Sequence, residues 1–367
     1  MKSSWPVHWT CWQPTPYNQF FFEAISCDSA VDLTVHFREQ QLASHPWASD
    51  FSRMFRSRVF ERTAGIDWRL LRLGARSSAL FVVAGWNDPS SIVLLNVLMA
   101  RRHPFAVWTD TPDLGAQRSP VKQMLRSAWL QRVFRLASAV LGTGTPALAA
   151  LSLMGCPPAK LRNLPYSVDL NSFNPRTVSR LREPLVFLSC GRLHQDKGFD
   201  LALSALARVY GGANRPFVYR IAGVGPERSR LSALAVELGV AGSVEFLDWV
   251  EPSDLPALYR QSDVLLHPAR REPYGVTVLE AMASGVAVIG SDATAAVIDR
   301  IVHGVNGFSH PSGDSSAMAG IIATIVQDPT SLDAVKREAR RTAEEWPVSR
   351  AVDIVKDLCS SALGRLN

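Results

Sequence analysis

The chain has 367 residues, of which 47% are apolar and 20% charged, a composition typical of globular proteins and unlike that of disordered or fibrous ones. Its length favours two domains, each large enough to bury a core. The longest apolar stretches, Ala79–Gly85 and Ile92–Ala100, are too short to span a membrane. The amino terminus does not show the basic-then-apolar pattern of a secretory signal, so we expect a cytoplasmic protein.

The net charge of +6 is unevenly distributed along the chain. Residues 1–175 hold 18 Lys and Arg against 11 Asp and Glu, whereas residues 176–367 hold 21 against 22. A basic half fits nucleic acid, an anionic membrane surface or an anionic small substrate, and charge alone does not distinguish these partners. The sequence shows neither an aromatic RNA-binding platform nor a helix-turn-helix pattern, which argues against nucleic acid.

Short apolar runs alternate with amphipathic helical patterns in chain order. The expected strands of the first half are Val7–Trp12, Leu33–Phe37, Leu80–Ala84, Phe105–Thr109 and Ala139–Gly142. Those of the second half are Leu185–Ser189, Phe217–Ala222, Ser243–Leu247, Val264–His267 and Val286–Gly290. Helices are expected between them near Phe199–Val209, Glu227–Leu238, Ser253–Gln261 and Gly275–Ala283. Apolar runs separated by helices predict parallel sheets covered by helices on both faces.

The sequence therefore predicts two doubly wound α/β domains, 1–175 and 176–347, divided at the polar, proline-bracketed stretch Asn174–Pro184. We expect residues 348–367 to form a helix that packs back on the first domain. Two such domains facing each other would place a ligand crevice between them, at the carboxyl ends of the strands.

Two rows of basic residues lie in the first half. One consists of Arg118, Lys122 and Arg126, and the other of Arg62, Arg69, Arg72 and Arg76. A four-residue spacing places the first row on one helical face. Such rows beside apolar residues fit the headgroups of an anionic membrane, at roughly 1 kcal/mol per basic residue, although a charge row is usually a solvated helix face. We favour peripheral membrane docking because both rows lie in the same domain.

Metal ligands and catalytic histidines are not indicated by the sequence. The five cysteines form no CxxC pair, which argues against a disulfide framework and a zinc cluster. The eight histidines form no HxxxH or HExxH pattern, and we interpret His194 and His267 as structural residues. We therefore expect the protein to need no metal and no other cofactor.

A basic loop follows the expected strand Leu185–Ser189. It reads GRLHQDKG from Gly191 to Gly198. A glycine at the strand end lets a ligand approach the backbone closely, and Arg192 and Lys197 supply two cations for a diphosphate. Alone, the loop fits an ordinary surface loop at least as well. The turn AGVGPE, which contains Gly223, is weaker still, because strand-to-helix turns need glycine for geometry.

The strongest local signal is REPYGVTVLEAMASG, from Arg271 to Gly285. Pro273 and Gly275 predict a tight turn, and the helix after it would direct the backbone N–H groups of Val276, Thr277 and Val278 toward a phosphate. The carboxylates of Glu272 and Glu280 could hold sugar hydroxyls at two points along an extended ligand. For either Glu alone, a solvated helix charge is an equally good interpretation.

The ordered array GRLxxxKG, AGxGP and EPYGxxxxEAMASG resembles the nucleotide-sugar domain of retaining glycosyltransferases of family 4, which have the GT-B fold. The spacing of the two Glu matches that family's E-x7-E signature. FLDWV followed by LPALY resembles its base-binding segment, and PYSVD from Pro165 to Asp169 resembles its hinge. The resemblance is clear over residues 140–345 and weaker before them. It implies two Rossmann-like domains facing across a cleft.

The resemblance also implies roles for individual residues. Arg192 and Lys197 would neutralise the departing diphosphate, Glu280 would bind the ribose, and Glu272 would hold the transferred sugar. The backbone at Val250 would meet the nucleobase. Further donor contacts are expected around the glycines and the helix start, at Gly191, Gly223, Tyr274, Gly275, Val276, Thr277 and Val278.

The reaction that the resemblance implies is retaining and independent of metal. The acceptor would attack on the face that the diphosphate leaves, and the departing phosphate oxygen would take its proton. Fixed cations and amides would stabilise the leaving group, and the chain contains no D-x-D anchor for a metal-bound diphosphate.

The first half departs from the family pattern. Pro14–Asn18 replaces a glycine-rich turn, and Asp110 stands where many members place a histidine. Asp110 either hydrogen-bonds a sugar hydroxyl, which we favour, or caps the following turn. Tyr17, Asn18 and Trp86 are acceptor candidates, and Trp86 fits a sugar-stacking aromatic and a loop anchor equally well.

The sequence thus predicts a hexosyltransferase that moves a sugar from a nucleotide diphosphate sugar to a hydroxyl of a lipid-linked, polysaccharide or small-molecule acceptor. The alternative is a non-catalytic GT-B-like protein that binds nucleotide sugars or partners an active transferase. A sugar-nucleotide epimerase on the same fold is a third hypothesis. The nucleobase, the sugar and the acceptor are not specified.

Overall fold

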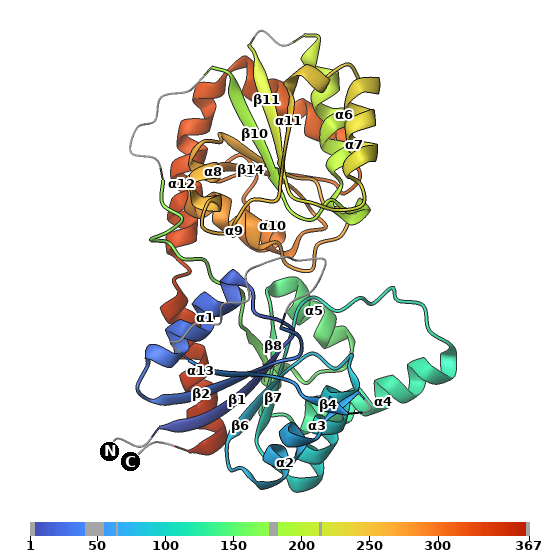
Figure 1. Cartoon of the computed structure of the whole chain (residues 1–367), viewed down its shortest axis with the longest axis vertical. Coiled ribbons are helices and arrows are strands. Elements are labelled where there is room, and N and C mark those ends of the chain that lie inside the picture. The colour runs from blue at the N-terminus through green and yellow to red at the C-terminus, as the bar shows by residue number, and fades with distance from the viewer. Residues whose placement is uncertain (1–3, 41–54, 64, 176–182, 213–214, 365–367) are drawn as a thin grey trace. The chain divides into compact units, whose positions relative to one another are not determined.

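The computed structural model of the chain describes residues 4–40, 55–63, 65–175, 183–212 and 215–364 (Figure 1). The chain forms two compact units, one of Met1–Ser167 with Val348–Asn367 and the other of Val168–Pro347. The division lies before the expected boundary at residues 175 and 176, and much of the expected seam Asn174–Pro184 lies outside the described residues. Arg340 explains the shift, because its guanidinium donates to the carbonyls of Phe173 at 2.8 Å and Ala283 at 2.6 Å and so ties residues 168–175 to the second unit.

The first unit is built on a seven-stranded parallel sheet with the order β3-β2-β1-β6-β7-β8-β9. Its strands are β1 (Trp5–Cys11), β2 (Val31–Phe37), β3 (Arg56–Val59), β6 (Leu80–Ala84), β7 (Phe105–Thr109), β8 (Ala139–Gly142) and β9 (Leu161–Asn163), and β4 (Arg62–Thr63) pairs separately with β5 (Ile66–Asp67). Its helices are α1 (Pro16–Cys27), α2 (Trp68–Arg76), α3 (Pro89–Arg101), α4 (Pro120–Leu136), α5 (Thr145–Leu153) and α13 (Val348–Leu363).

Alternating side chains of this sheet build two cores, one on each face. Val7 and Trp9 of β1 belong to a cluster with α1 and α13, whereas Phe81 and Val83 of β6 belong to a cluster with α2, α3 and α4 (Figure 1). Helix α13 therefore packs on the first unit, where Lys356 also pairs with Asp28 of the chain segment after α1 at 2.9 Å. Burial of both faces explains the continuous apolar runs of the strands.

The second unit has a six-stranded parallel sheet with the order β12-β11-β10-β13-β14-β15. Its strands are β10 (Leu185–Cys190), β11 (Phe217–Ala222), β12 (Val244–Asp248), β13 (Val264–His267), β14 (Ala287–Ser291) and β15 (Phe308–His310). Its helices are α6 (Phe199–Tyr210), α7 (Arg228–Glu237), α8 (Leu255–Arg260), α9 (Val276–Ala283), α10 (Ala295–Arg300), α11 (Ser315–Gln327) and α12 (Leu332–Glu344). Each of the ten predicted strands is confirmed, with ends shifted by at most two residues.

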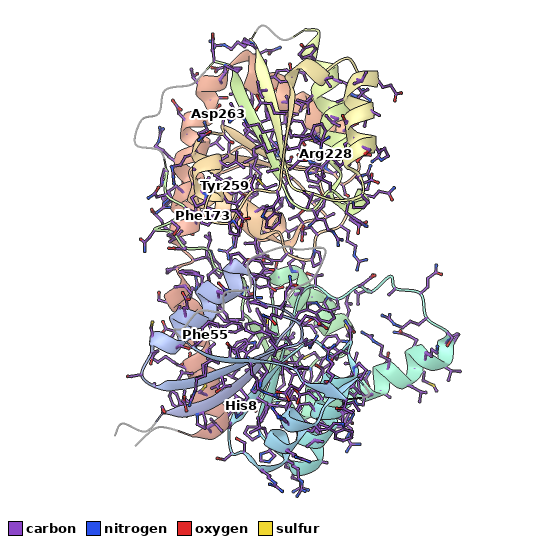
Figure 2. The ribbon with its side chains drawn as sticks, viewed as in Figure 1. His8, Phe55, Phe173, Arg228, Tyr259 and Asp263 are labelled. Atoms are coloured by element: carbon purple, nitrogen blue, oxygen red, sulfur yellow. The ribbon has the colours of Figure 1, made fainter. Side chains whose placement is uncertain are left out.

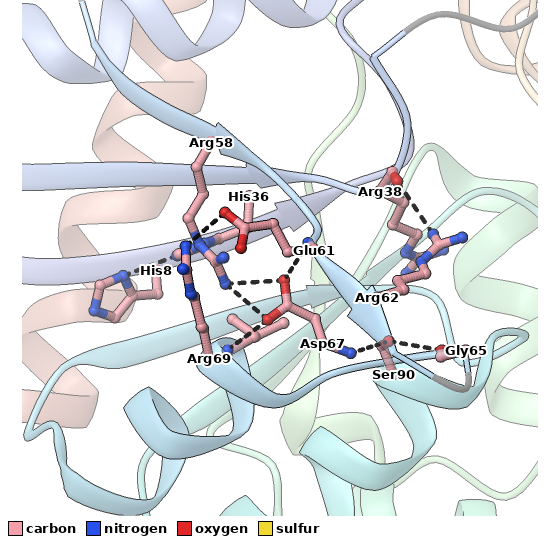
Figure 3. A network of polar contacts seen from close by, with 11 residues as sticks. His8, His36, Arg38, Arg58, Glu61, Arg62, Gly65, Asp67, Arg69 and Ser90 are labelled. Atoms are coloured by element: carbon pink, nitrogen blue, oxygen red, sulfur yellow. Dashed lines mark hydrogen bonds and ion pairs between the residues drawn. The ribbon is translucent and has the colours of Figure 1, made fainter.

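A polar network crosses one face of the first unit's sheet (Figure 3). Nε of Arg58 donates to Nδ1 of His36 at 2.7 Å, so the proton of that imidazole lies on Nε2, which faces Nδ1 of His8 at 3.1 Å. Arg58 also pairs at 3.2 Å with Asp67, whose side chain caps α2 by accepting from the N–H of Leu70 at 2.8 Å. The network joins β1, β2 and β3 to the start of α2, and we interpret it as structural.

Candidate functional site

The candidate donor site lies at the carboxyl edge of the second unit's sheet, where four neighbouring strands end. Gly191 follows β10, Gly223 follows β11 and Val250 follows β12 by two residues, while His267 is the last residue of β13. The predicted donor residues therefore come from loops that the parallel sheet gathers at one edge, which is where doubly wound sheets bind ligands.

Two of these loops are held together by Arg270. Its guanidinium forms a bidentate pair with Asp200 at the start of α6, with N–O distances of 2.7 and 2.8 Å. It also donates to the carbonyl of Gln195 at 3.0 Å, and the backbone N–H of Arg270 donates to the carbonyl of Asp196 at 2.7 Å. The basic loop after β10 is thus fastened to the loop after β13, which brings Lys197 to Glu272.

Lys197 and Glu272 form an ion pair through Nζ and Oε2. The side chain of Glu272 is 12% exposed, and burial alone would raise the pKa of its carboxyl group. The attraction of Lys197, together with His267 and with the hydrogen bonds from Lys197 and the backbone of Tyr274, outweighs burial and lowers that pKa below its ordinary value. The pair gives the site a carboxylate that stays ionised and a cation fixed beside it.

Glu280 lies in a different environment. Its Oε2 accepts a hydrogen bond from the hydroxyl of Tyr259 at 2.9 Å. Burial raises the pKa of Glu280 to about 7, and the bond from Tyr259 opposes that rise. The two carboxylates of the E-x7-E pattern therefore differ, since Glu272 is ionised near neutral pH and Glu280 is close to its midpoint.

The start of α9 offers two backbone donors rather than the three we predicted. The N–H of Val278 donates to the carbonyl of Gly275 at 3.1 Å, because the first turn closes on that carbonyl, so this part of the prediction is wrong. Within the described part of the chain, the N–H groups of Val276 and Thr277 have no such partner. The side chain of Tyr274 is only 2% exposed and its hydroxyl lies 3.5 Å from Arg300, so it packs in the interior.

Gly223 and Arg192 complete the edge. The N–H of Gly223 donates to the carbonyl of Asp248 at 2.6 Å, and an added Cβ on Gly223 would lie 1.9 Å from the carbonyl oxygen of Gly191. Only glycine permits this approach of two loops. The guanidinium of Arg192 is partly buried and has no ion-pair partner among the described residues, so it differs from Arg270 and Lys197 in being available to an anion.

The predicted acceptor residues belong to the first unit, at the carboxyl edge of its own sheet. Oδ1 of Asp110, just after β7, accepts a hydrogen bond from the hydroxyl of Thr143 at 2.9 Å, and its carboxylate also bonds Tyr166. The Tyr17 ring meets the Tyr166 ring edge-on at 5.0 Å. Asn18 is buried and bonds Sγ of Cys11 at 3.3 Å. Asp110 and Tyr17 thus share a neighbour, while Asn18 is oriented toward β1.

Trp86 is not placed to stack on a sugar. The side chain is 5% exposed and packs edge-on against Phe134 of α4 at 5.8 Å between ring centroids, inside the core shared with α2 and α3. The Arg126 guanidinium lies 5.9 Å from its ring centroid. The structure therefore favours the alternative that Trp86 anchors a loop.

Both basic rows are less regular than predicted. Arg118 lies before α4, which begins at Pro120, so it does not share a helical face with Lys122 and Arg126. Arg62 lies in β4 and not in α2 with Arg69, Arg72 and Arg76. Pro120 sets the helix start in the first case, and the short β4–β5 pair interrupts the second row. The structure shows in addition that Val121, Met124 and Leu125 of α4 are 62 to 63% exposed.

Sequence reasoning did not identify Arg270 or Asp200 as parts of the site, and it included Tyr259 in the LPALY segment without assigning its side chain a role. Arg270 and Asp200 are 70 residues apart, and Tyr259 lies 21 residues before Glu280 on another helix. Arg270 directly precedes the predicted motif, which begins at Arg271, and this position was the one local signal that could have identified it. The partners of both Arg270 and Glu280 depend on how the strands are ordered in the sheet.

The second unit matches a known sequence family. Residues 174–342 fit the model of the family described as glycosyl transferases group 1. The amylovoran biosynthesis glycosyltransferase AmsK of Erwinia amylovora is 27% identical over 202 residues, which cover 53% of this chain and 49% of that protein. A D-inositol 3-phosphate glycosyltransferase of Acidothermus cellulolyticus is 33% identical over 209 residues, covering 52% and 45%. The chain spans about half the length of the curated relatives it matches.

Solved structures resemble the chain over nearly its whole length. HepE of Anabaena in complex with UDP superposes with a TM-score of 0.77 at 19% identity, covering 97% of this chain and 100% of that one. The same protein in complex with UDP-glucose gives 0.73 at 20% identity, with coverage of 97% and 99%. The likeness confirms the predicted GT-B fold of two parallel-sheet α/β units. No helix among the described residues is both long and apolar enough to cross a membrane.

Proposed function

We propose that this protein is a glycosyltransferase that moves a sugar from a nucleotide diphosphate sugar to a hydroxyl group of an acceptor. The observation that carries the proposal is that two carboxylates have different partners, Glu272 before α9 with Lys197 and Glu280 within α9 with Tyr259. These residues fall within 174–342, the range that fits the glycosyl transferases group 1 model.

Each part of the nucleotide sugar would be bound by residues of complementary charge or hydrogen-bonding capacity. The diphosphate would be bound by Arg192, by Lys197 and by the N–H groups of Val276 and Thr277, where the dipole of α9 favours negative charge. Glu280 would accept hydrogen bonds from the ribose, and Glu272 from the transferred sugar. The backbone at Val250 would meet the nucleobase. The HepE complexes with UDP and UDP-glucose make the uridine nucleotide the first donor to test.

We further propose a retaining transfer that needs no metal, as in glycosyltransferase family 4. The acceptor hydroxyl would approach the anomeric carbon from the face that the diphosphate leaves. The bond from that carbon to the phosphate oxygen breaks, the bond to the acceptor oxygen forms, and the departing phosphate oxygen takes the acceptor's proton. Arg192 and Lys197 would stabilise the charge that develops on the leaving diphosphate.

The acceptor would be a lipid-linked, polysaccharide or small-molecule hydroxyl, oriented by Asp110 and Tyr17 of the first unit. The relative AmsK is named for amylovoran biosynthesis, which supports a role in polysaccharide assembly. The start of α4 combines exposed Val121, Met124 and Leu125 with basic residues, and supports docking on an anionic membrane surface. A location at the cytoplasmic face of that membrane remains a prediction.

Binding and transfer with a panel of UDP- and GDP-sugars test the proposal. We expect one donor to bind, and its nucleoside diphosphate to be released in step with sugar transfer when an acceptor is added. Lys197→Ala and Glu272→Gln should abolish transfer. Donor binding without hydrolysis or transfer to any offered acceptor would instead support the non-catalytic alternative, and release of an isomerised donor would support an epimerase.

A further inference from the structure

Two buried polar side chains at the donor site have a polar atom without a hydrogen-bond partner among the described residues. His267 is 6% exposed and its Nε2 is unpartnered, and Thr294 is fully buried with its Oγ1 unpartnered. Leaving a buried donor or acceptor unsatisfied costs about 1–3 kcal/mol, so each such group needs an explanation, such as a bound ligand or a water molecule.

Both side chains lie beside Gly275, where a larger residue would not fit without displacing its neighbours. An added Cβ on Gly275 would lie 2.6 Å from Cγ2 of Thr294, 3.5 Å from Nε2 of His267 and 3.3 Å from Cγ of Glu272. Glu272 and Thr294 also form an isolated parallel bridge, so their backbones are fixed side by side. Three polar side chains therefore converge on Gly275, and their present positions require a glycine there.

The imidazole of His267 is neutral and its tautomer follows from its neighbour. Burial lowers the pKa of His267 to about 4, so the ring carries one proton at neutral pH. Its Nδ1 lies 3.3 Å from the hydroxyl of Thr277, which can donate to it, and the Glu272 carboxylate on the other side of the ring favours the tautomer with the proton on Nε2. Nε2 is 3.8 Å from Oε2 of Glu272, too far for a hydrogen bond between them.

The side chains around Gly275 thus include a donor at Nε2 of His267, an acceptor at the Glu272 carboxylate and the hydroxyl of Thr294, which has no partner among the described residues. A ligand hydroxyl matches this set, because it accepts from Nε2 while donating its own proton to the carboxylate. We propose that His267 and Thr294, with Glu272, bind one hydroxyl group of the transferred sugar and help determine which sugar the enzyme accepts. This inference rests on the proposed function, and it replaces the interpretation of His267 as a structural residue.

Thr294→Val and His267→Leu test the proposal, since the first keeps the shape of the side chain and stays informative if the second does not fold. Calorimetric titration would measure the affinity of each variant for UDP and for UDP-glucose, or for the donor that the panel identifies. We expect each variant to bind the nucleotide sugar roughly tenfold more weakly than the wild type does, and UDP equally well. His310→Leu is the matched control, because His310 is also buried with an unpartnered Nε2 but belongs to β15.

Donor analogues that each lack one hydroxyl identify the group bound. We expect one analogue to bind the wild type more weakly than the complete donor does. The variants should bind that analogue and the complete donor with the same affinity. If the variants lost the same affinity for UDP as for the nucleotide sugar, the proposal would be overturned. It would also be overturned if, for every analogue, the loss of affinity from the variant added to the loss from the missing hydroxyl, which is the result expected if a water molecule satisfies His267. A wild type that binds no nucleotide sugar would overturn the proposed function itself.

Discussion

The hydroxyl of Tyr259 donates a hydrogen bond to Oε2 of Glu280 at 2.9 Å, and it also lies 3.4 Å from the carbonyl of Thr277. Phe173 packs edge-on against the Tyr259 ring at 5.8 Å (Figure 2). One tyrosine therefore orients the carboxylate that we assign to the ribose and also contacts the backbone of the first turn of α9.

Tyr259→Phe should weaken nucleotide binding and move its pH dependence. Burial raises the pKa of Glu280 to about 7 and the Tyr259 bond opposes that rise, so its loss moves the pKa higher. If the carboxylate form binds the ribose, affinity rises with pH through that pKa, and the midpoint of the variant shifts upward. We expect UDP affinity at pH 7 to fall roughly tenfold, measured by calorimetry between pH 5.5 and 9.

Tyr219→Phe is the control for that experiment. Tyr219 lies on strand β11 of the same unit and is equally buried. Its hydroxyl donates to Oγ of Ser189 at 2.9 Å. A similar loss of UDP affinity in both variants, without a shift of the midpoint, would show that Tyr259 acts only through packing.

Lys197 and Glu272 should be strongly coupled. Lys197→Ala leaves the largely buried Glu272 carboxylate without its counter-ion, so we expect a loss of about 1–3 kcal/mol in the free energy of unfolding. In the double variant Lys197→Ala/Glu272→Ala the loss should be smaller than the sum of the two single losses. Urea unfolding of the four proteins measures this difference, and strict additivity would argue against the ion pair in solution.

Gly223→Ala should destabilise the second unit and abolish donor binding. Its φ of 143° is disfavoured for other residues, and the new Cβ would lie 1.9 Å from a backbone oxygen. We expect a loss of at least about 2 kcal/mol from backbone strain and displacement of the loop. Gly239→Ala is the comparison, because it also has a positive φ but no atom within 4 Å of the added Cβ. Equal thermal stabilities of the two variants would contradict the close approach.

Acid should destabilise the first unit through the network of Figure 3. Burial, with the charges of Arg58 and Arg56, lowers the pKa of His8 from its ordinary value of 6.5 to about 4. Between these values the unfolded chain binds a proton that the folded chain does not, so stability falls as pH drops from 6.5 to 4. In His8→Leu the fall of the urea midpoint over this range should be shallower. An unchanged fall would show that His8 is protonated equally in both states.

Helix α4 should bind anionic vesicles through its first two turns. Helix α4 contains four basic and no acidic residues, and Val121, Met124 and Leu125 are exposed in its first two turns. Co-sedimentation should require anionic lipid, weaken with salt and be lost in Leu125→Glu. Val236→Glu changes an equally exposed apolar residue of α7 in the second unit and should bind normally. Equal binding by the two variants would contradict docking through α4.

Local sequence motifs predicted the secondary structure of this protein better than they predicted which distant residues become neighbours. Pro273 and Gly275 predicted the start of α9 correctly, and apolar runs predicted ten of the fifteen strands among the described residues, because turn chemistry and burial on both faces act over a few residues. The burial of Trp86 was not decided by its local sequence. A tryptophan after a strand fits a contact site and a core equally well until the helix that covers it, here α4, is placed.

The sequence by itself determined two doubly wound parallel sheets, the ordered donor motifs and the basic character of the first half. The tertiary structure decided what each charge meets. It paired Glu272 with Lys197 and Glu280 with Tyr259, fastened two loops through Arg270 and Asp200, and left Nε2 of His267 without a partner. Side chains distant in the sequence become neighbours only through strand order, and their pKa values depend on burial and partners that no local pattern contains.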